Sequence, residues 1–302
     1  MSTSIYTNER LASRLWDRSA DYFELMKPKI AALELVTVAA AAFVAGWVPE
    51  SPLTLLHALL GTALVAASAS AMNHFLERDT DAKMQRTASR PLPTGRMTSR
   101  SAIIFAAVTG MLGVGYLLAA TNVLTAALAL ATWVLYVGVY TPLKSRTTLN
   151  TPVGAVAGAL PILIGWSAGG AALGPMAWVL FAIVFIWQFP HFMAIAWIYR
   201  KQYDRAGLQM SPVVCPSGRS AARQAIGLAA LLVPVSLVPV WLTSEIGAGY
   251  FFAALMLGVV QLAFAVVFGK HLSDASARRL MRASVIYLPA LLLLLMFSPL
   301  IS

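Results

Sequence analysis

The stretch Asn73–Arg96, NHFLERDTDAKMQRTASRPLPTGR, decides how this chain of 302 residues is organised. It directly follows a long apolar run that ends at Met72, so it continues one end of a hydrophobic helix. In that helix Asn73, Glu77 and Asp81 recur at every fourth residue and share one face. Much of the charge of an otherwise apolar chain is therefore concentrated at the end of one helix.

The acidic pair on this face favours a metal ion. Glu77 and Asp81 are about 6 Å apart along the helix axis, and carboxylates this close repel each other unless a hard cation such as Mg²⁺, shared with phosphate oxygens, relieves the repulsion. Asp79 lies on the opposite side of the helix. The cations of the stretch are suited to the remaining phosphate oxygens: Arg78, Lys83, Arg86, Arg90 and Arg96. We predict a Mg²⁺–diphosphate site here, with a solvated, salt-bridged loop as the plainer alternative.

The composition indicates an all-α, polytopic membrane protein. Hydrophobic residues make up 59% of the chain and charged residues 11%, and the mean hydropathy is +0.75, far from the values of an ordinary soluble domain. The formal net charge of +10 does not indicate nucleic-acid binding, because the basic residues lie between apolar segments. Cys215 is the only cysteine, which excludes disulfides within the chain.

Nine apolar segments are long enough to cross a hydrocarbon core, which takes about 20 residues of helix. They are predicted near 30–48, 53–73, 101–119, 122–141, 151–169, 174–198, 224–242, 247–269 and 283–300. All 22 Lys and Arg residues lie before the first segment or in alternate connections, and the other connections hold none. By the positive-inside rule the N-terminus is cytoplasmic and the C-terminus external.

We expect residues 1–302 to form one intramembrane domain, with the nine helices around a central cavity. Residues 1–29 are then a cytoplasmic N-terminal segment. The two longest loops, about 74–100 and 199–223, lie on the cytoplasmic side and are predicted to form a polar cap over the cavity. Such a site accepts a charged head from the cytoplasm and an apolar tail from the bilayer.

Polar residues inside predicted spans need an explanation. Glu34 is an intramembrane acid, which indicates function, but it lies about 7 Å of helix rise from the nearest lysine, and snorkelling toward the interface explains it equally well. Gln188 and His191 are neighbours at membrane depth beside Pro190, which removes a backbone donor and predicts a helix break. We interpret this pair as lining the cavity; a structural hydrogen bond of the histidine is the alternative.

A third polar cluster is Tyr140–Asn150, YTPLKSRTTLN. Its proline and dense hydroxyl groups predict a fixed turn that presents Lys144 and Arg146 to an anion. The alternative is that these two charges only direct the membrane topology. Three glycines of the following span are spaced for close helix packing. The chain has no GxGxxG, P-loop, HExxH or nucleophile-elbow motif.

These motifs resemble the UbiA superfamily of intramembrane prenyltransferases, and most closely its protohaem IX farnesyltransferase branch. The resemblance covers nearly the whole chain. Residues 73–81 are similar to the first aspartate-rich motif of the superfamily, and MQRTASRPLPTG at 84–95 to the segment that follows it. YTPLKSRTTLN with GAVAGALPILIGW downstream, and WQFPHFMAIAW, match the branch itself.

The resemblance implies transfer of a farnesyl group from farnesyl diphosphate to the vinyl side chain of haem B, giving haem O for haem–copper oxidases. It implies Mg²⁺ as cofactor, held by Asn73, Glu77 and Asp81, which with Arg86 form the catalytic group. The implied diphosphate ligands are Arg78, Lys83, Arg90, Lys144 and Arg146. The implied haem contacts are Trp187, Gln188 and His191, with the imidazole as an iron ligand or a porphyrin contact. The implied setting is the cell inner membrane and its lipid, with a haem A synthase as partner.

Two positions depart from the family pattern. Glu77 stands where Asp is usual, which keeps the carboxylate and lengthens its reach. The second-loop motif usually has an acid before the tyrosine and here reads Lys201-Gln202-Tyr203-Asp204. Because Gln202 has no charge to offer a metal, a second Mg²⁺ would need Asp204, and Lys201, Tyr203 and Asp204 are the site candidates of this loop.

Two other classes fit part of the sequence. An aromatic prenyltransferase of quinone or chlorophyll biosynthesis shares the first motif but does not need WQFPHF. A nine-helix transporter fits the hydropathy, but transporters usually have polar or broken segments at mid-membrane in both halves. In this chain the polar residues crowd the cytoplasmic ends of the spans.

Overall fold

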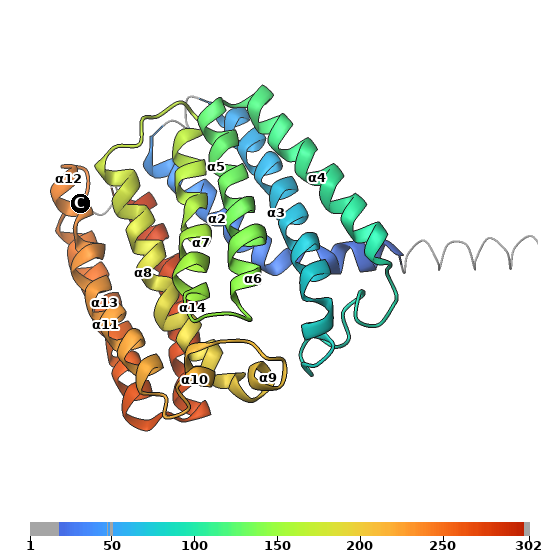
Figure 1. Ribbon diagram of the computed structural model, residues 1–302. Helices are drawn as coiled ribbons and strands as arrows, with labels where there is room; N and C mark the ends of the chain where they lie inside the picture. The colour runs from blue at the N-terminus through green and yellow to red at the C-terminus, as the bar shows by residue number, and fades with distance from the viewer. Residues whose placement is uncertain (1–17, 47, 49–50, 299–302) are drawn as a thin grey trace, which may run out of the picture.

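The computed structural model describes residues 18–46, 48 and 51–298. All regular secondary structure within these residues is helical, which confirms the predicted all-α class, and the long helices stand side by side in one bundle (Figure 1). The long helices are α2 (Pro28–Val44), α3 (Pro52–Asp81), α4 (Ser99–Ala120), α5 (Val123–Trp133), α7 (Asn150–Ser167), α8 (Pro175–Ile198), α11 (Arg219–Leu237), α13 (Ala248–His271) and α14 (Asp274–Met296). The short elements are the π-helix η1 (Val134–Tyr140), α6 (Thr141–Leu143), α9 (Arg200–Arg205), α10 (Ser211–Val214) and α12 (Pro239–Leu242). Residues 18–25 are also helical.

Seven helical stretches of the described chain are long and apolar enough to cross a membrane. They are α3, α4, the continuous run from α5 to α6, α8, the run from α11 to α12, α13 and α14. Helices α2 and α7 lie at the other two predicted positions and have 17 and 18 residues. The multi-pass architecture is therefore confirmed. The predictions for residues 1–17 and 299–302 fall outside the described residues.

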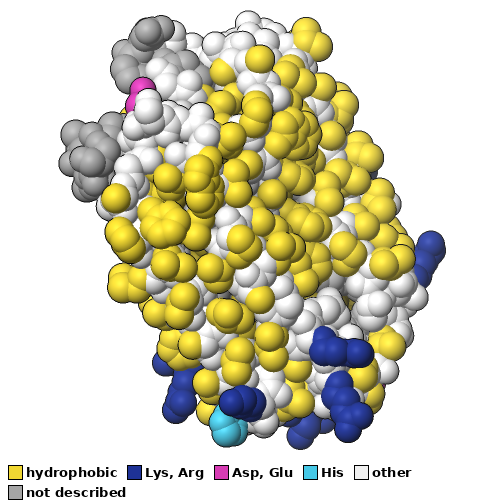
Figure 2. Space-filling model, turned by 90° about the vertical axis from the view of Figure 1, so that its left-hand side faces the viewer, with side chains coloured by type: hydrophobic (Ala, Val, Ile, Leu, Met, Phe, Trp, Pro, Cys, Tyr) yellow, Lys and Arg dark blue, Asp and Glu magenta, His cyan; other side chains and the backbone are white. Residues whose placement is uncertain are grey.

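The surface divides into an apolar body and a basic end. In Figure 2 hydrophobic side chains cover the middle of the molecule, and Lys and Arg gather toward its lower end. That end holds α9, α10 and the connection between α3 and α4 in Figure 1. Large apolar side chains such as Met111, Phe252 and Ile286 are more than 60% exposed on the body. A soluble monomer rarely exposes so much contiguous apolar surface, and lipid is its natural solvent here.

The main core lies where α2, α7, α8 and α14 meet, around residues such as Ile162, Ile183 and Leu291. A Cβ at Gly165 in α7 would overlap the carbonyl oxygen of Val38 in α2, so these two helices touch through their backbones. Close approach of this kind explains why the position has no side chain. It also holds α2 against α7, which in turn packs on α8, the helix that carries Gln188 and His191.

Three local predictions differ from the structure. Helix α8 runs through Pro190 without a break, because packing against neighbouring helices stabilises a proline inside a membrane helix. The polar cluster that starts at Tyr140 does not turn at once: η1 and α6 keep it helical as far as Leu143. The last helix begins at Asp274 and not near 283, because Ser273 and Ser276 form a capping box ahead of its apolar part.

Candidate active site

The last turns of α3 place Asn73, Glu77 and Asp81 on one enclosed face. Asn73 is 0% and Asp81 is 1% exposed, and the side chain of Glu77 is 13% exposed. The side chain of Asp79, in contrast, is 79% exposed. Helix α3 extends to Asp81, so its regular geometry aligns all three inward-facing side chains.

Two ion pairs join the acids of this face to cations from the loops. Lys144 Nζ lies 2.6 Å from Glu77 Oε1, and Arg90 Nη1 lies 2.6 Å from Asp81 Oδ2. Burial by itself would lower the pKa of the Lys144 ammonium, but the negative charge of Glu77 outweighs that effect and raises the pKa above its ordinary value. The structure thus brings four of the predicted site residues into direct contact.

Lys27, which was not among the predicted site residues, joins the same face. Its Nζ donates a hydrogen bond to Asn73 Oδ1 at 2.6 Å, and Asn73 Nδ2 donates to Thr141 Oγ1 at 3.0 Å. Burial, reinforced by the positive charges of Arg90 and Lys144, lowers the pKa of Lys27 to about 7. Three basic side chains from three separate segments therefore converge on the polar oxygens of the last turns of α3.

The donor set of this face fits a Mg²⁺ ion. Asp81 Oδ1 is buried and has no hydrogen-bond partner among the described residues, and Glu77 uses only Oε1 for its ion pair. Carboxylate oxygens are the ligands that Mg²⁺ prefers. No group of three or more His, Cys, Asp or Glu side chains that could hold a metal occurs in the part of the chain that the structure describes. A metal here would therefore complete its coordination with water or with oxygens of a bound phosphate.

The other predicted diphosphate ligands lie outside this cluster. Arg78 Nη1 donates to the carbonyl of Phe75 at 2.9 Å, and Arg78 pairs with the exposed Asp79 at 3.5 Å, so it is turned away from Glu77. The remaining three are exposed on the loops: Lys83, Arg86 and Arg146.

Arg96 makes structural ion pairs and does not face the α3 cluster. Its Nη1 lies 2.5 Å from Asp21 Oδ1 and its Nη2 lies 2.9 Å from Glu24 Oε2. These pairs attach the helical residues 18–25 to the loop that follows α3.

The two long loops meet beside the cluster. Arg86 N donates to Gln202 Oε1 at 3.2 Å, and the Arg86 guanidinium carbon lies 4.7 Å from the ring centroid of Tyr199. Tyr203 is buried in an apolar contact that includes Met84. Gln202 therefore joins the second long loop to the first.

The candidates on either side of Tyr203 are turned outward. Lys201 and Asp204 are both exposed, and the structure gives neither of them an ion pair within its described residues. The second loop also holds the Lys144 turn in place, because Gln209 N donates to the carbonyl of Lys144 at 2.6 Å and Asn150 Nδ2 donates to the carbonyl of Gln209 at 2.9 Å.

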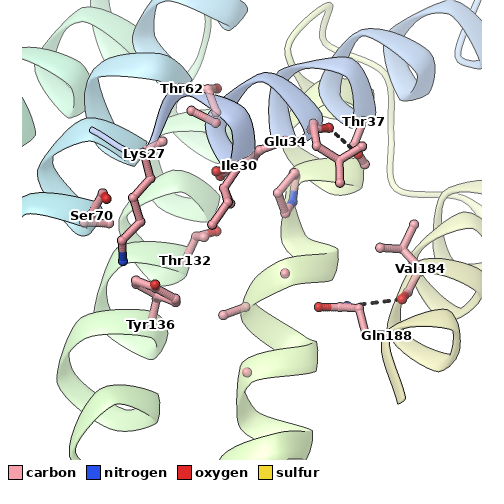
Figure 3. A pocket seen from close by; sticks show the side chains of 18 of the residues that line it. Lys27, Ile30, Glu34, Thr37, Thr62, Ser70, Thr132, Tyr136, Val184 and Gln188 are labelled. Atoms are coloured by element: carbon pink, nitrogen blue, oxygen red, sulfur yellow. Dashed lines mark hydrogen bonds between the residues drawn. The ribbon is translucent and has the colours of Figure 1, made fainter. Parts of the chain in front are cut away.

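A cavity of about 450 Å³ lies beside this cluster, which it meets at Lys27, and extends into the bundle. Lys27 and Tyr136 lie on one side of it and Val184 and Gln188 on the other (Figure 3). Glu34 lines the same cavity from α2. Most of the lining is apolar, so the cavity offers an allylic or other hydrophobic chain a place away from water.

Gln188 is fixed in the cavity wall. Its Nε2 donates to the carbonyls of Ala155 at 2.9 Å and Val184 at 3.1 Å. A Cβ on Gly158 would overlap Gln188 Oε1, so glycine at this position makes room for the amide. Gly154 does the same for the ring of Tyr140.

His191 lines the cavity one turn beyond Gln188. Its ring stacks on Trp187, with centroids 5.3 Å apart and an interplanar angle of 17°. Its Nδ1 lies 2.8 Å from the hydroxyl of Ser284 in α14. Ser284 was not among the predicted site residues, since it lies 93 residues away from His191 in the chain.

The fold and the acid–cation face define an intramembrane prenyltransferase: the chain belongs to the UbiA prenyltransferase family, whose model matches residues 35–296. This confirms the resemblance seen in the sequence. The similar curated relatives include the protoheme IX farnesyltransferase of Salinibacter ruber, 46% identical over 287 residues that cover 93% of this chain and 98% of that one. The protoheme IX farnesyltransferase of Koribacter versatilis is 44% identical over 288 residues, covering 92% and 93%.

Solved structures agree on the fold. A digeranylgeranylglyceryl phosphate synthase superposes with a TM-score of 0.78 at 17% identity, covering 93% of this chain and 98% of that one. A UbiA homologue from Archaeoglobus fulgidus, bound to DMAPP and Mg²⁺, superposes with a TM-score of 0.65 at 19% identity, covering 91% and 99%.

Proposed function

We propose that this protein transfers a farnesyl group from farnesyl diphosphate to a vinyl side chain of haem B and so forms haem O. The observation that carries the proposal is the face of α3, where two carboxylates and three cations meet beside an apolar cavity. The names of the relatives support these two substrates in particular.

The diphosphate binds at the α3 face. Diphosphate leaves a carbon atom readily only when its growing negative charge is neutralised. Arg90 and Lys144 supply two positive charges within reach of that face, and a bound diphosphate would favour the protonated form of Lys27, whose pKa is about 7. A Mg²⁺ held by Glu77 and Asp81, with the Asn73 amide beside them, would supply further Lewis-acid neutralisation of the leaving group. The positive charge extends along the neighbouring loops through Lys83, Arg86 and Arg146.

The cavity protects the allylic cation that remains when the C–O bond to diphosphate breaks. Its lining is mostly apolar, and water that entered it freely would capture the cation before the acceptor did. The vinyl group of haem B donates its π electrons to the farnesyl carbon, which forms the new C–C bond and leaves a cation on the haem side. Water adds to that cation and loses a proton, which gives the hydroxyethylfarnesyl group.

The haem binds at the end of the cavity that carries Trp187, Gln188 and His191. The Trp187 and His191 rings stack on each other, so the tryptophan fixes the plane in which the imidazole reaches into the cavity. This end lies on α8, away from the α3 face that takes the diphosphate. The two substrates therefore approach each other from opposite sides.

The proposal includes the topology. Helices α2 and α7 complete nine spans, the basic end of Figure 2 faces the cytoplasm, and the two loops joined by Arg86 and Gln202 form the cap over the site. The farnesylated product is more apolar than haem B and stays in the bilayer. A haem A synthase, which oxidises haem O, is the partner that we propose to receive it.

The test is turnover by membranes that contain the full chain. They are incubated with haem B, farnesyl diphosphate and Mg²⁺, and the pigments are separated by chromatography. Haem O should form, and its formation should cease when the metal is chelated. An aromatic quinone precursor offered in place of haem B should give no prenylated product. Prenylation of that precursor without any haem O would overturn the proposal.

A further inference from the structure

The hydroxyl of Ser284 contacts two groups at once. Ser284 Oγ lies 2.7 Å from the carbonyl oxygen of Met281, one turn back in α14, and 2.8 Å from Nδ1 of His191 in α8. Ser284 is 0% exposed, so water does not compete for the hydroxyl. Both distances are those of full hydrogen bonds.

These two contacts determine the tautomer of the imidazole. A serine hydroxyl carries one proton, and a carbonyl oxygen can only accept. Two oxygens 2.7 Å apart with no proton between them would repel, so the Ser284 proton lies on the Met281 side. The hydroxyl oxygen then accepts from His191, which places a proton on Nδ1. No carboxylate pairs with His191 among the described residues, so the ring is neutral and Nε2 carries a lone pair.

The lone pair faces the cavity. His191 lines the cavity, and its Nε2 has no hydrogen-bond partner in the described protein, yet it is not one of the buried unpaired atoms. A second contact fixes the plane of the ring: Trp187 stacks on it, and Trp187 Nε1 donates to the main-chain carbonyl of Ser284 at 2.7 Å. One residue of α14 thus orients both aromatic rings.

We propose that Ser284 is a positioning residue that holds His191 as an axial ligand for the iron of the haem substrate. A neutral imidazole with a hydrogen-bonded Nδ1–H and a free Nε2 is the form that binds haem iron. Binding through iron fixes one point of the porphyrin, and Trp187, stacked on the imidazole, fixes the orientation of the ligand ring. The vinyl group is then held at a set place relative to the allylic carbon. This inference rests on the proposed function, because it assumes that haem B is the acceptor.

The experiment uses the purified full-length protein with added ferric haem. Ser284→Thr and Ser284→Val form a matched pair of nearly equal shape that differ by the hydroxyl, and His191→Ala removes the ligand. Ser236→Ala is the control, because Ser236 is equally buried and its hydroxyl also bonds a carbonyl three residues earlier. The readouts are the Soret band and electron paramagnetic resonance of the bound haem, its Kd by absorbance titration, and haem O formation.

Wild type, Ser284→Thr and Ser236→Ala should show the spectrum of an imidazole-ligated haem. Ser284→Val should bind haem about tenfold more weakly, with a mixed or altered ligation spectrum, and His191→Ala should lose the signature. A wild type that forms haem O with a spectrum unaffected by His191→Ala and Ser284→Val would overturn this inference and leave the proposed function standing. A wild type that folds but neither binds haem nor forms haem O would overturn both.

Discussion

Glu77 Oε1 and Lys144 Nζ lie 2.6 Å apart although 67 residues separate them in the chain. Both side chains are 13% exposed, so the pair is mostly shielded from water. When one partner of such a shielded pair is removed, the other charge is left uncompensated. The resulting loss of folding stability is larger than the stability that the intact pair contributes.

The first prediction follows from that pair. Lys144→Met should lower haem O formation by about 100-fold, because it removes one cation from the leaving group, and it should destabilise the protein by about 3 kcal/mol through the stranded Glu77. Turnover and the unfolding midpoint of the purified protein measure the two effects. Lys270→Met, at an exposed position at the end of α13, is the control and should change neither. Normal turnover in Lys144→Met would show that Lys144 does not take part in the reaction.

The two aspartates at the end of α3 should differ sharply. Asp81→Asn should abolish turnover while the protein still folds and retains haem, because the carboxylate is assigned to the metal and not to the porphyrin. Asp79→Asn should keep turnover within about twofold, since that side chain is 79% exposed and paired only with Arg78. Steady-state assays at several Mg²⁺ concentrations compare them. Equal losses in both variants would contradict the buried face described above.

Haem and diphosphate binding should separate by mutation. His191→Ala should weaken haem binding and activity but leave Mg²⁺-dependent farnesyl diphosphate binding largely intact, because its imidazole is assigned to the haem end of the cavity. Glu77→Ala should do the reverse. An absorbance titration with haem and a calorimetric titration with the diphosphate on each variant decide the matter. If His191→Ala weakened diphosphate binding and left haem binding intact, the assignment of the two ends of the cavity to haem and diphosphate would be wrong.

Gly158 should prove sensitive to a single methyl group. Gly158→Ala places a Cβ against Gln188 Oε1, and displacement of that amide breaks its bond to Ala155 and narrows the cavity. We expect a loss of about 1 kcal/mol in stability from the broken bond and weaker haem binding. Gly227→Ala in α11 is the control, because a Cβ there meets nothing within 4 Å. The higher helix propensity of alanine should stabilise the protein by up to about 1 kcal/mol. Thermal unfolding and haem titration distinguish the two.

Topology can be tested with reporters. The distribution of the 22 Lys and Arg residues predicts that a reporter fused after Ser302 is external and that one inserted near Ser89 is cytoplasmic. Fusions that are active on only one side of the membrane measure this. Both reporters on the same side would exclude the arrangement of nine spans.

The sequence predicted the helices well because apolar length and charge are local properties. Asn73, Glu77 and Asp81 share a face for the same reason, since a regular helix aligns residues four apart. Boundaries were missed where a helix begins with polar residues: α14 starts at the capping box of Ser273, ahead of its apolar part. Pro190 misled the prediction because its effect depends on the neighbours that pack around it.

The long-range contacts could not be predicted from local pattern. Lys27 stands just outside the first span, where charge that directs topology already explains a lysine, and only the fold brings it to Asn73. Ser284 looks like any helical serine that bonds the carbonyl of the preceding turn. Arg78 was misjudged because the sequence places it beside Glu77, whereas the helix turns it toward Phe75.

The three cations of the α3 face also set an order of assembly. They come from positions 27, 90 and 144, so a growing chain has made the acids long before it has made the last of their counter-ions. A half-translated protein in the membrane holds two adjacent carboxylates and an incomplete set of cations. It acquires the means to ionise a prenyl diphosphate only when the segment that follows η1 has been inserted. By then the first four predicted spans are in place, but the cavity walls that α7 and α8 contribute follow later in the chain, so the cations for the leaving group are complete before the apolar chamber that shields the reactive cation from water.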